Sequence, residues 1–187
     1  MISDARKAAY DVTHPIFFDA NVWLSLYAPP SDENDFWKGE YSKVLKRIVD
    51  DGIEVLVDST VVSEYINRYC RLEFEAYAGL NPKKTFKQFR DSEPDIYKPI
   101  AHDAAEAVKE RLDLPRIKRV DGGFATMDIV AMLDKFGEGK SDWNDQQIVD
   151  LCQRNKCSLL TNDADFKDAP GIDILTCNGK LLGHVKY

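Results

Sequence analysis

The stretch LLTNDADF, residues 159–166, decides the fold: a short apolar run ends in Asp163 and Asp165 before the chain resumes with Phe166. An apolar run bounded by polar residues is typical of a buried strand. An ionised carboxylate at the exit of such a strand loses solvation unless a cation or a cationic group compensates for it. We therefore expect Asp163 to face a cationic partner.

The same alternation of apolar runs and helical patterns extends over most of the chain. Strands are predicted at 15–19, 53–58, 157–163 and 171–176, and helices at 20–27, 36–50, 61–74, 125–136 and 143–155. Ser59 and Thr60 are expected to cap the helix after the second strand, and residues 116–120 could form a strand or a basic loop. Strands separated by helices imply an α/β fold with a mostly parallel sheet covered by helices on both faces.

Length and composition predict one domain over residues 1–187. The apolar fraction is 44% and the charged fraction 30%, which is ordinary for a globular protein. No stretch approaches the roughly 20 apolar residues that would span a bilayer, and the first residues lack the apolar run of a signal peptide. We therefore expect a cytoplasmic protein without a membrane partner.

The net charge of −7 argues against a protein that coats nucleic acid nonspecifically, because that mode needs surplus Lys and Arg. It allows a nuclease, since an acidic active site contributes negative charges of its own. The cysteines form no C-x-x-C pair and are expected to be buried thiols: Cys70, Cys152, Cys157 and Cys177. The histidines are scattered and predict no metal site: His14, His102 and His184.

Acidic residues recur at the ends of the predicted strands, where open α/β sheets bind their ligands. These residues are Asp19, Asp58 and Asp163, and Glu64 lies on the helix after the second strand. Asp142 and Asp145 stand three residues apart at a helix N-terminus, so both carboxylates are expected on one side of that helix.

Carboxylates that converge in this way need cations. Two unit charges about 4 Å apart repel by about 4 kcal/mol at an effective dielectric near 20, which a protein of ordinary stability cannot sustain several times over. Mg²⁺ or Mn²⁺ prefers carboxylate oxygen. Two such ions could activate water and stabilise the attacking and leaving oxygens of a phosphodiester.

Each acid also has a structural alternative. Asp142 would serve as a helix N-cap, Asp165 could make a local Asx-turn, and Asp58 fits a turn better than a metal site. Glu64 could lie on a plain helix surface, although Val61, Val62 and Ile66 around it predict burial.

Four segments in order resemble the PIN domain, a family of metal-dependent nucleases that includes ribonuclease toxins of toxin–antitoxin systems. The segments are FFDANVWL at 17–24, DSTVVSEYINR at 58–68, NDQQIVDLC at 144–152 and LLTNDADF at 159–166. The resemblance implies a three-layer α/β/α sandwich with a mostly parallel central sheet. It also implies catalytic carboxylates at Asp19, Glu64, Asp145 and Asp163, with Asn21 and Thr161 orienting carboxylates or water.

The sequence departs from the family's pattern in two places. Ala20 stands where the family often has Thr or Ser, and residues 72–120 form a longer helical elaboration than the compact toxins carry. Neither toxicity nor a cognate antitoxin therefore follows from the likeness.

The elaboration is rich in basic and aromatic residues, and prolines interrupt its helical pattern at Pro82, Pro94 and Pro99. The basic residues are Lys83, Lys84, Lys87, Arg90, Arg116, Lys118 and Arg119, interleaved with Phe86, Phe89 and Tyr97. They could hold phosphates and stack on bases. Solvated helix faces, with the phenylalanines turned to the core, explain them equally well.

The resulting hypothesis is a Mg²⁺- or Mn²⁺-dependent endonuclease acting on RNA. The expected metal ligands are Asp19, Glu64, Asp142, Asp145 and Asp163, with Asp165 as an additional acid. An antitoxin or other protein partner and a homodimer are left open as further partners. The alternative is a catalytically silent PIN-like module that binds RNA or protein, whereas a phosphatase of the haloacid dehalogenase type lacks its D-x-D-x-T motif here.

Overall fold

The structure is a computed structural model that describes residues 1–32, 35–80, 84–139 and 141–183. Its centre is a six-stranded sheet in the order β1-β6-β5-β2-β3-β4, in which every pair of neighbours is parallel. The strands are β1 (Ile2–Asp4), β2 (Ile16–Phe18), β3 (Val55–Val57), β4 (Ile117–Arg119), β5 (Ser158–Leu160) and β6 (Ile174–Thr176). The predicted parallel sheet is therefore confirmed.

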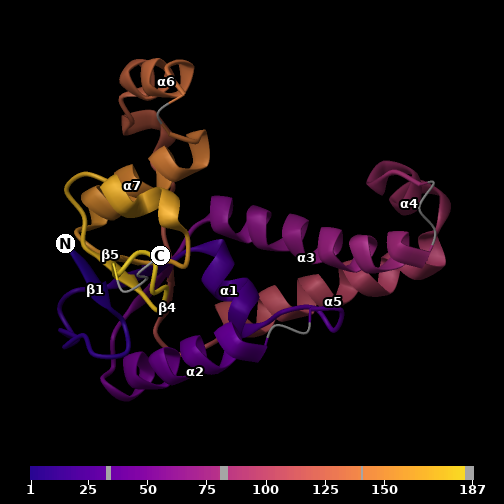
Figure 1. The fold of residues 1–187 in the computed structure, drawn as a ribbon, viewed down its shortest axis with the longest axis horizontal. Helices are drawn as coiled ribbons and strands as arrows, with labels where there is room; N and C mark the ends of the chain where they lie inside the picture. Colours follow the sequence, from indigo (N-terminus) through magenta and orange to yellow (C-terminus); the bar gives the residue numbers. More distant parts are fainter. Residues whose placement is uncertain (33–34, 81–83, 140, 184–187) are drawn as a thin grey trace.

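The helices are α1 (Ala20–Leu26), α2 (Asp35–Asp50), α3 (Ser59–Leu80), α4 (Phe86–Ser92), α5 (Pro94–Leu112), α6 (Ile129–Gly137) and α7 (Trp143–Asn155). Figure 1 shows the sheet between α7 on one side and α2 on the other, as the predicted sandwich requires. None of the described helices is long and apolar enough to cross a membrane.

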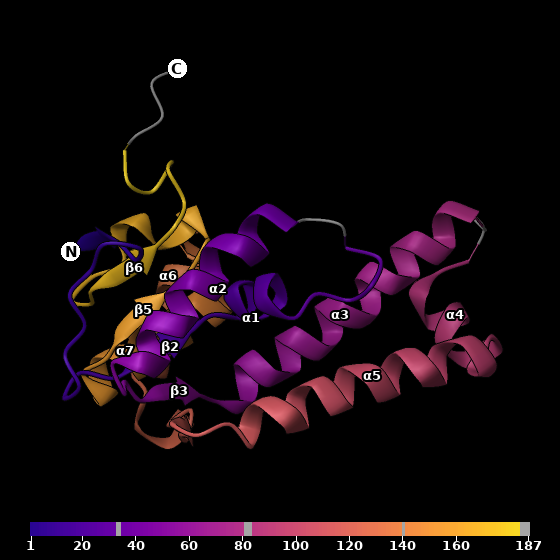
Figure 2. The ribbon, with the colours of Figure 1, turned by 90° about the horizontal axis from the view of Figure 1, so that it is seen from below.

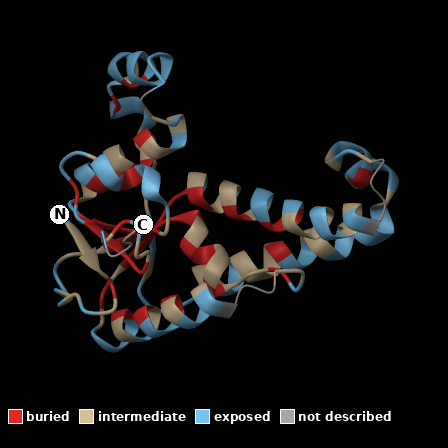
Figure 3. Cartoon of the chain, in the orientation of Figure 1, coloured by how far each residue is buried: buried red, intermediate tan, exposed pale blue. Residues whose placement is uncertain are grey.

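The middle strands are continuous apolar runs because helices cover both faces of the sheet. Ile16, Phe17 and Phe18 of β2 are all buried, and β2 pairs with β3 on one side and β5 on the other. Such strands lack the alternation of half-buried ones, which is typical of parallel sheets. Figure 3 shows this buried band at the centre of the molecule.

Two strands were harder to predict than the central ones. Residues 117–119, left open between strand and loop, form the edge strand β4 beside β3. The other edge strand, β1, was not predicted, because three residues of mixed polarity carry no periodic signal. Pairing with β6, between Ile2 and Ile174, makes it a strand.

Helices α3, α4 and α5 form an arm that extends away from the sheet (Figures 1 and 2). Pro94 separates α4 from α5, as expected, whereas Pro99 lies inside α5 and does not interrupt it. Asn81, Pro82 and Lys83 lie outside the described residues.

An aromatic cluster holds the arm together. Its rings come from α3, α4 and α5: Phe74, Tyr77, Phe86, Phe89 and Tyr97. Phe89 is fully buried, so it packs in the arm's core and cannot stack on a base. Lys84 pairs with Glu93, and Arg90 pairs with Asp91. The core-facing alternative is therefore the correct one for Phe89.

All four cysteines are free and buried, as predicted. Cys152 at the end of α7 and Cys157 just before β5 lie against the sheet within the main core. Their thiols therefore contribute to packing.

Candidate functional site

Asp19 stands where β2 ends and α1 begins, and its side chain is only 4% exposed. Two neutral donors hold its Oδ2 atom: Thr161 Oγ1 at 2.6 Å and Asn21 Nδ2 at 2.5 Å. Burial raises the pKa of Asp19, the hydrogen bond from Thr161 lowers it, and the nearby Asp163 carboxylate raises it again. The net direction is upward, as expected of a buried carboxylate without a cation.

The loop after β5 carries Thr161 and Asp163. The N–H of Asp163 donates to Thr161 Oγ1 at 3.0 Å, and the N–H of Asn162 donates to the Asn21 side chain at 3.0 Å. Asp163 in turn accepts from the N–H of Asp165 at 2.9 Å. The loop thereby fixes the second acid relative to the first.

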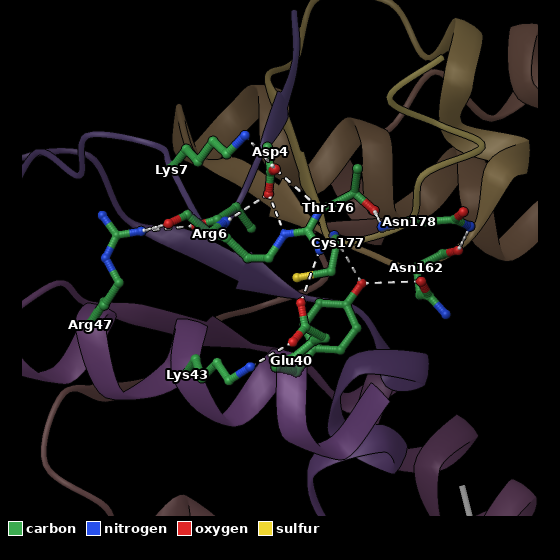
Figure 4. A network of polar contacts seen from close by, with 12 residues as sticks. Asp4, Arg6, Lys7, Glu40, Lys43, Arg47, Asn162, Thr176, Cys177 and Asn178 are labelled. Carbon is green, nitrogen blue, oxygen red and sulfur yellow. Dashed lines mark hydrogen bonds and ion pairs between the residues drawn. The ribbon is translucent and has the colours of Figure 1, made fainter. Parts of the chain in front are cut away.

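A polar network behind this loop supports it from α2 and β6 (Figure 4). The Tyr41 hydroxyl donates to the carbonyl of Thr161 at 3.2 Å, and Asn178 Nδ2 donates to the carbonyl of Asn162 at 2.8 Å. Arg6 ties Asp4 to Glu40 in the same network. The acid-bearing loop is thus held by strands and helices distant in sequence.

Glu64 reaches the site from the second turn of α3. Its pKa is raised, first by burial and then by repulsion from Asp19, whereas Arg68 on the next turn lowers it. Glu64 is half-buried rather than buried, and it lines a pocket together with Asp19, Asp145 and Asp163.

Asp145 lies in the first turn of α7 and faces the same pocket as Asp19, Glu64 and Asp163. Burial raises its pKa to about 7, followed by repulsion from Asp142, Asp163 and Asp19. Asp142 is the N-cap of α7 and accepts from the N–H of Asn144 at 2.8 Å. A carboxylate with such a pKa is half protonated near neutral pH, which is a common property of functional sites.

These four acids line one pocket of about 360 Å³ between α1, α3, α7 and the loop after β5. We call it the acid pocket; its polar lining residues are Asp19, Asn21, Ser25, Asp32, Glu64, Arg68, Asp145 and Asp163. The predicted catalytic set is therefore brought together from four separate segments.

Three predicted acids lie elsewhere. Asp142 is exposed at its capping position and is not part of the acid-pocket lining. Asp165 is exposed and lines a neighbouring groove. Asp58 is buried, and its Oδ1 accepts from the N–H of Val61, so Asp58 caps α3. The expectation that Ser59 and Thr60 provide that cap is wrong, because the helix already begins at Ser59.

The donors of the acid pocket are carboxylate, amide and hydroxyl oxygens, which suit Mg²⁺ or Mn²⁺. Among the residues that the structure describes, however, no three acidic, histidine or cysteine side chains stand close enough together to hold an ion as they are. The four carboxylates nevertheless line one common pocket.

Sequence reasoning missed Arg68, a basic residue of this acid-lined pocket. The signal was available: Arg68 follows Glu64 by four residues, and such pairs share one helix face. Ser25 was missed as well; its hydroxyl donates to the carbonyl of Asn21.

Comparison with known proteins bears on the fold and the family. The PIN domain family matches residues 16–172. No curated protein sequence matches. Among solved structures, the chain resembles the VapBC2 complex of Rickettsia felis, crystallised with a DNA fragment from their promoter. The TM-score is 0.51 at 14% identity, with 86% of this chain and 97% of that chain covered, so this likeness shows the fold alone.

Proposed function

Because the chain belongs to the PIN domain family, we propose that it is a metal-dependent endonuclease that hydrolyses phosphodiester bonds in RNA. The observation that carries the proposal is the acid pocket, in which Asp19, Glu64, Asp145 and Asp163 converge from α1, α3, α7 and the β5 loop. The pKa values of Asp19, Glu64 and Asp145 are raised, first by burial and then by repulsion from neighbouring carboxylates, and a bound cation would oppose both effects.

Each residue has a role in this proposal. The four acids hold two Mg²⁺ or Mn²⁺ ions, with Asp142 and Asp165 as outer acids that add to the negative potential. Bound ions would supply an activated water and stabilise charge on the phosphate oxygens. Thr161 and Asn21 donate to Oδ2 of Asp19 and so orient its carboxylate toward the ions.

The experiment measures cleavage of a fluorescent single-stranded RNA with Mn²⁺, with Mg²⁺ and with EDTA. The variants are Asp145→Asn and Asp163→Asn, which keep side-chain size and remove a charge. The matched control is Asp150→Asn on the same helix α7; Asp150 pairs with Arg154 and does not line the acid pocket. Loss of cleavage in the first two variants, with an active control, supports the proposal. Equal rates in all of them would overturn it.

A second candidate is a catalytically silent module, and one observation favours it: the described acids are not assembled to hold an ion. Ala20, which offers no hydroxyl beside Asp19, is compatible with it. The two candidates differ in the response of thermal stability to Mn²⁺, because a ligand that binds only the native state must stabilise it.

An antitoxin-type protein partner and a homodimer stay proposals. The support for the first is that one structural neighbour is a VapBC2 complex. Co-purification with the product of an adjacent gene, followed by measurement of the mass of the complex in solution, tests the first, and the mass of the isolated chain tests the second.

A further inference from the structure

A second polar groove adjoins the acid pocket. It has a volume of about 530 Å³, lies between α3 and the start of α7, and shares Glu64 and Arg68 with the acid pocket. Its further polar side chains include Ser63, Asn67, Arg71, Asn144 and Gln147. We call it the α3–α7 groove.

The lining of the α3–α7 groove consists of groups that can donate hydrogen bonds, with one exception. Arg68 and Arg71 carry positive charge, the hydroxyl and amide side chains can donate, and Glu64 is the lone carboxylate among the described lining residues. Although the whole chain has a net charge of −7, the charged side chains of this groove are two arginines and one glutamate, so their net charge is positive. Such a lining suits an anionic polymer.

The two arginines are available to a ligand. In the described part of the chain neither forms an ion pair, whereas Arg6, Arg90 and Arg154 each hold a carboxylate. Arg71 stacks over the ring of Phe86 at 5.0 Å, which orders its guanidinium without neutralising it. Spaced three residues apart on α3, the two side chains are neighbours on one helix face.

The groove on the other side of α7 has a negatively charged lining instead. It shares Asp145 with the acid pocket, and the charged residues of its lining are five aspartates and one lysine: Asp128, Asp145, Asp150, Asp165, Asp168 and Lys135. A phosphate chain would be repelled there. Of these two grooves, as the described residues line them, the α3–α7 groove is the one with the charge to accept nucleic acid.

We propose that the α3–α7 groove binds the sugar–phosphate backbone of single-stranded RNA, with Arg68 and Arg71 contacting successive phosphates beside the scissile one. This rests on the proposed nuclease function and adds the path of the substrate. No aromatic residue lines the groove among the described residues, so contacts go to phosphate and ribose. Binding would therefore depend on salt more than on base sequence.

The test is fluorescence anisotropy of a labelled oligouridine with EDTA and no divalent ion, over a range of KCl concentrations. Each lost phosphate contact should lower the salt slope by about 0.7 and weaken binding about fivefold at about 0.1 M salt. We expect this of Arg68→Ala and of Arg71→Ala. Arg71→Lys, which keeps the charge, should recover most of the affinity.

Arg90→Ala is the matched control, because Arg90 lies on α4 at the far end of the arm and pairs with Asp91. It should bind like the wild type. Thermal unfolding of each variant verifies folding, which matters for Arg71 because of its contact with Phe86.

Three results would overturn the proposal: wild-type affinity in Arg68→Ala and Arg71→Ala, an equal loss in Arg90→Ala, or tighter binding of a duplex than of the single strand. Since binding is measured without metal, a failure of catalysis cannot imitate a failure of the groove. Conversely, Asp163→Asn, expected to be inactive, should still bind the oligouridine at least as tightly as the wild type.

Discussion

Thr161 Oγ1 donates to Asp19 Oδ2 at 2.6 Å and accepts from the N–H of Asp163 at 3.0 Å, so one hydroxyl connects two acids that lie far apart in sequence. The hydroxyl is fully buried. It lowers the pKa of Asp19 against the upward effect of burial and of the Asp163 charge. Thr161 therefore positions the central carboxylate and favours its charged form against the larger effect of burial.

Thr161→Val should lower metal affinity or RNA cleavage about 10–100-fold, the usual cost of removing a group that orients a metal ligand. The unfolding free energy should fall by about 1–3 kcal/mol, because a buried acceptor and a buried donor lose their partner. Thr176→Val is the matched control: Thr176 is equally buried, at the end of β6, and accepts from the N–H of Asn178. It should lose stability but keep activity. Equal activity in both variants would remove Thr161 from the site.

Stability should fall as pH rises through the range of the raised carboxyl pKa values. Asp145 has a pKa of about 7 in the folded chain, against the ordinary aspartate value of 3.8, so the native state holds the extra proton between these values. Folding is then favoured at low pH, and the unfolding free energy decreases from about pH 4 to about pH 7, by on the order of 2 kcal/mol after allowance for solvent screening. Asp145→Asn should flatten this slope in urea unfolding measured at several pH values. An unchanged slope would contradict the raised pKa.

Mn²⁺ should stabilise the wild-type chain. At about 100 times the dissociation constant, a ligand adds about 2.7 kcal/mol, which corresponds to a rise in Tm of about 5–10 °C for a chain of this size. Asp163→Asn should show a much smaller rise, and Asp150→Asn a full one. Because bound metal requires ionised carboxylates, the effect should grow between pH 6 and pH 8. A flat Tm in the wild type favours the silent module.

Phe89→Ala should destabilise the arm by about 3–5 kcal/mol, since it removes a fully buried ring from the aromatic cluster. The exposed Phe124 provides the control, and Phe124→Ala should change stability by less than about 0.5 kcal/mol. Chemical denaturation of both variants measures the difference. If Phe89→Ala weakened RNA binding without a loss of stability, the assignment of Phe89 to the arm's core would be wrong, and the ring would instead stack on a base.

The acid pocket could be predicted because each of its carboxylates follows a strong local pattern. Asp19 and Asp163 come directly after apolar runs, and parallel strands place their carboxyl ends at one edge of the sheet. Glu64 and Asp145 belong to helical patterns whose hydrophobic faces were clear. Asp142 was less certain, since a helix N-cap and a metal ligand require the same side chain, and the structure places it at the cap.

The sequence by itself determined the alternation of elements and the identity of the acids, because apolar periodicity and strand-exit positions are local properties. Only the tertiary structure decided which residues share a surface. It buried Phe89 in the arm's core, made a strand of Ile2–Asp4 by pairing with β6, and brought Arg71 of α3 and Gln147 of α7 to one groove. The physical reason is that burial, strand pairing and the meeting of charges from different elements depend on contacts between segments far apart in the sequence. A short stretch of neighbouring residues does not contain those contacts.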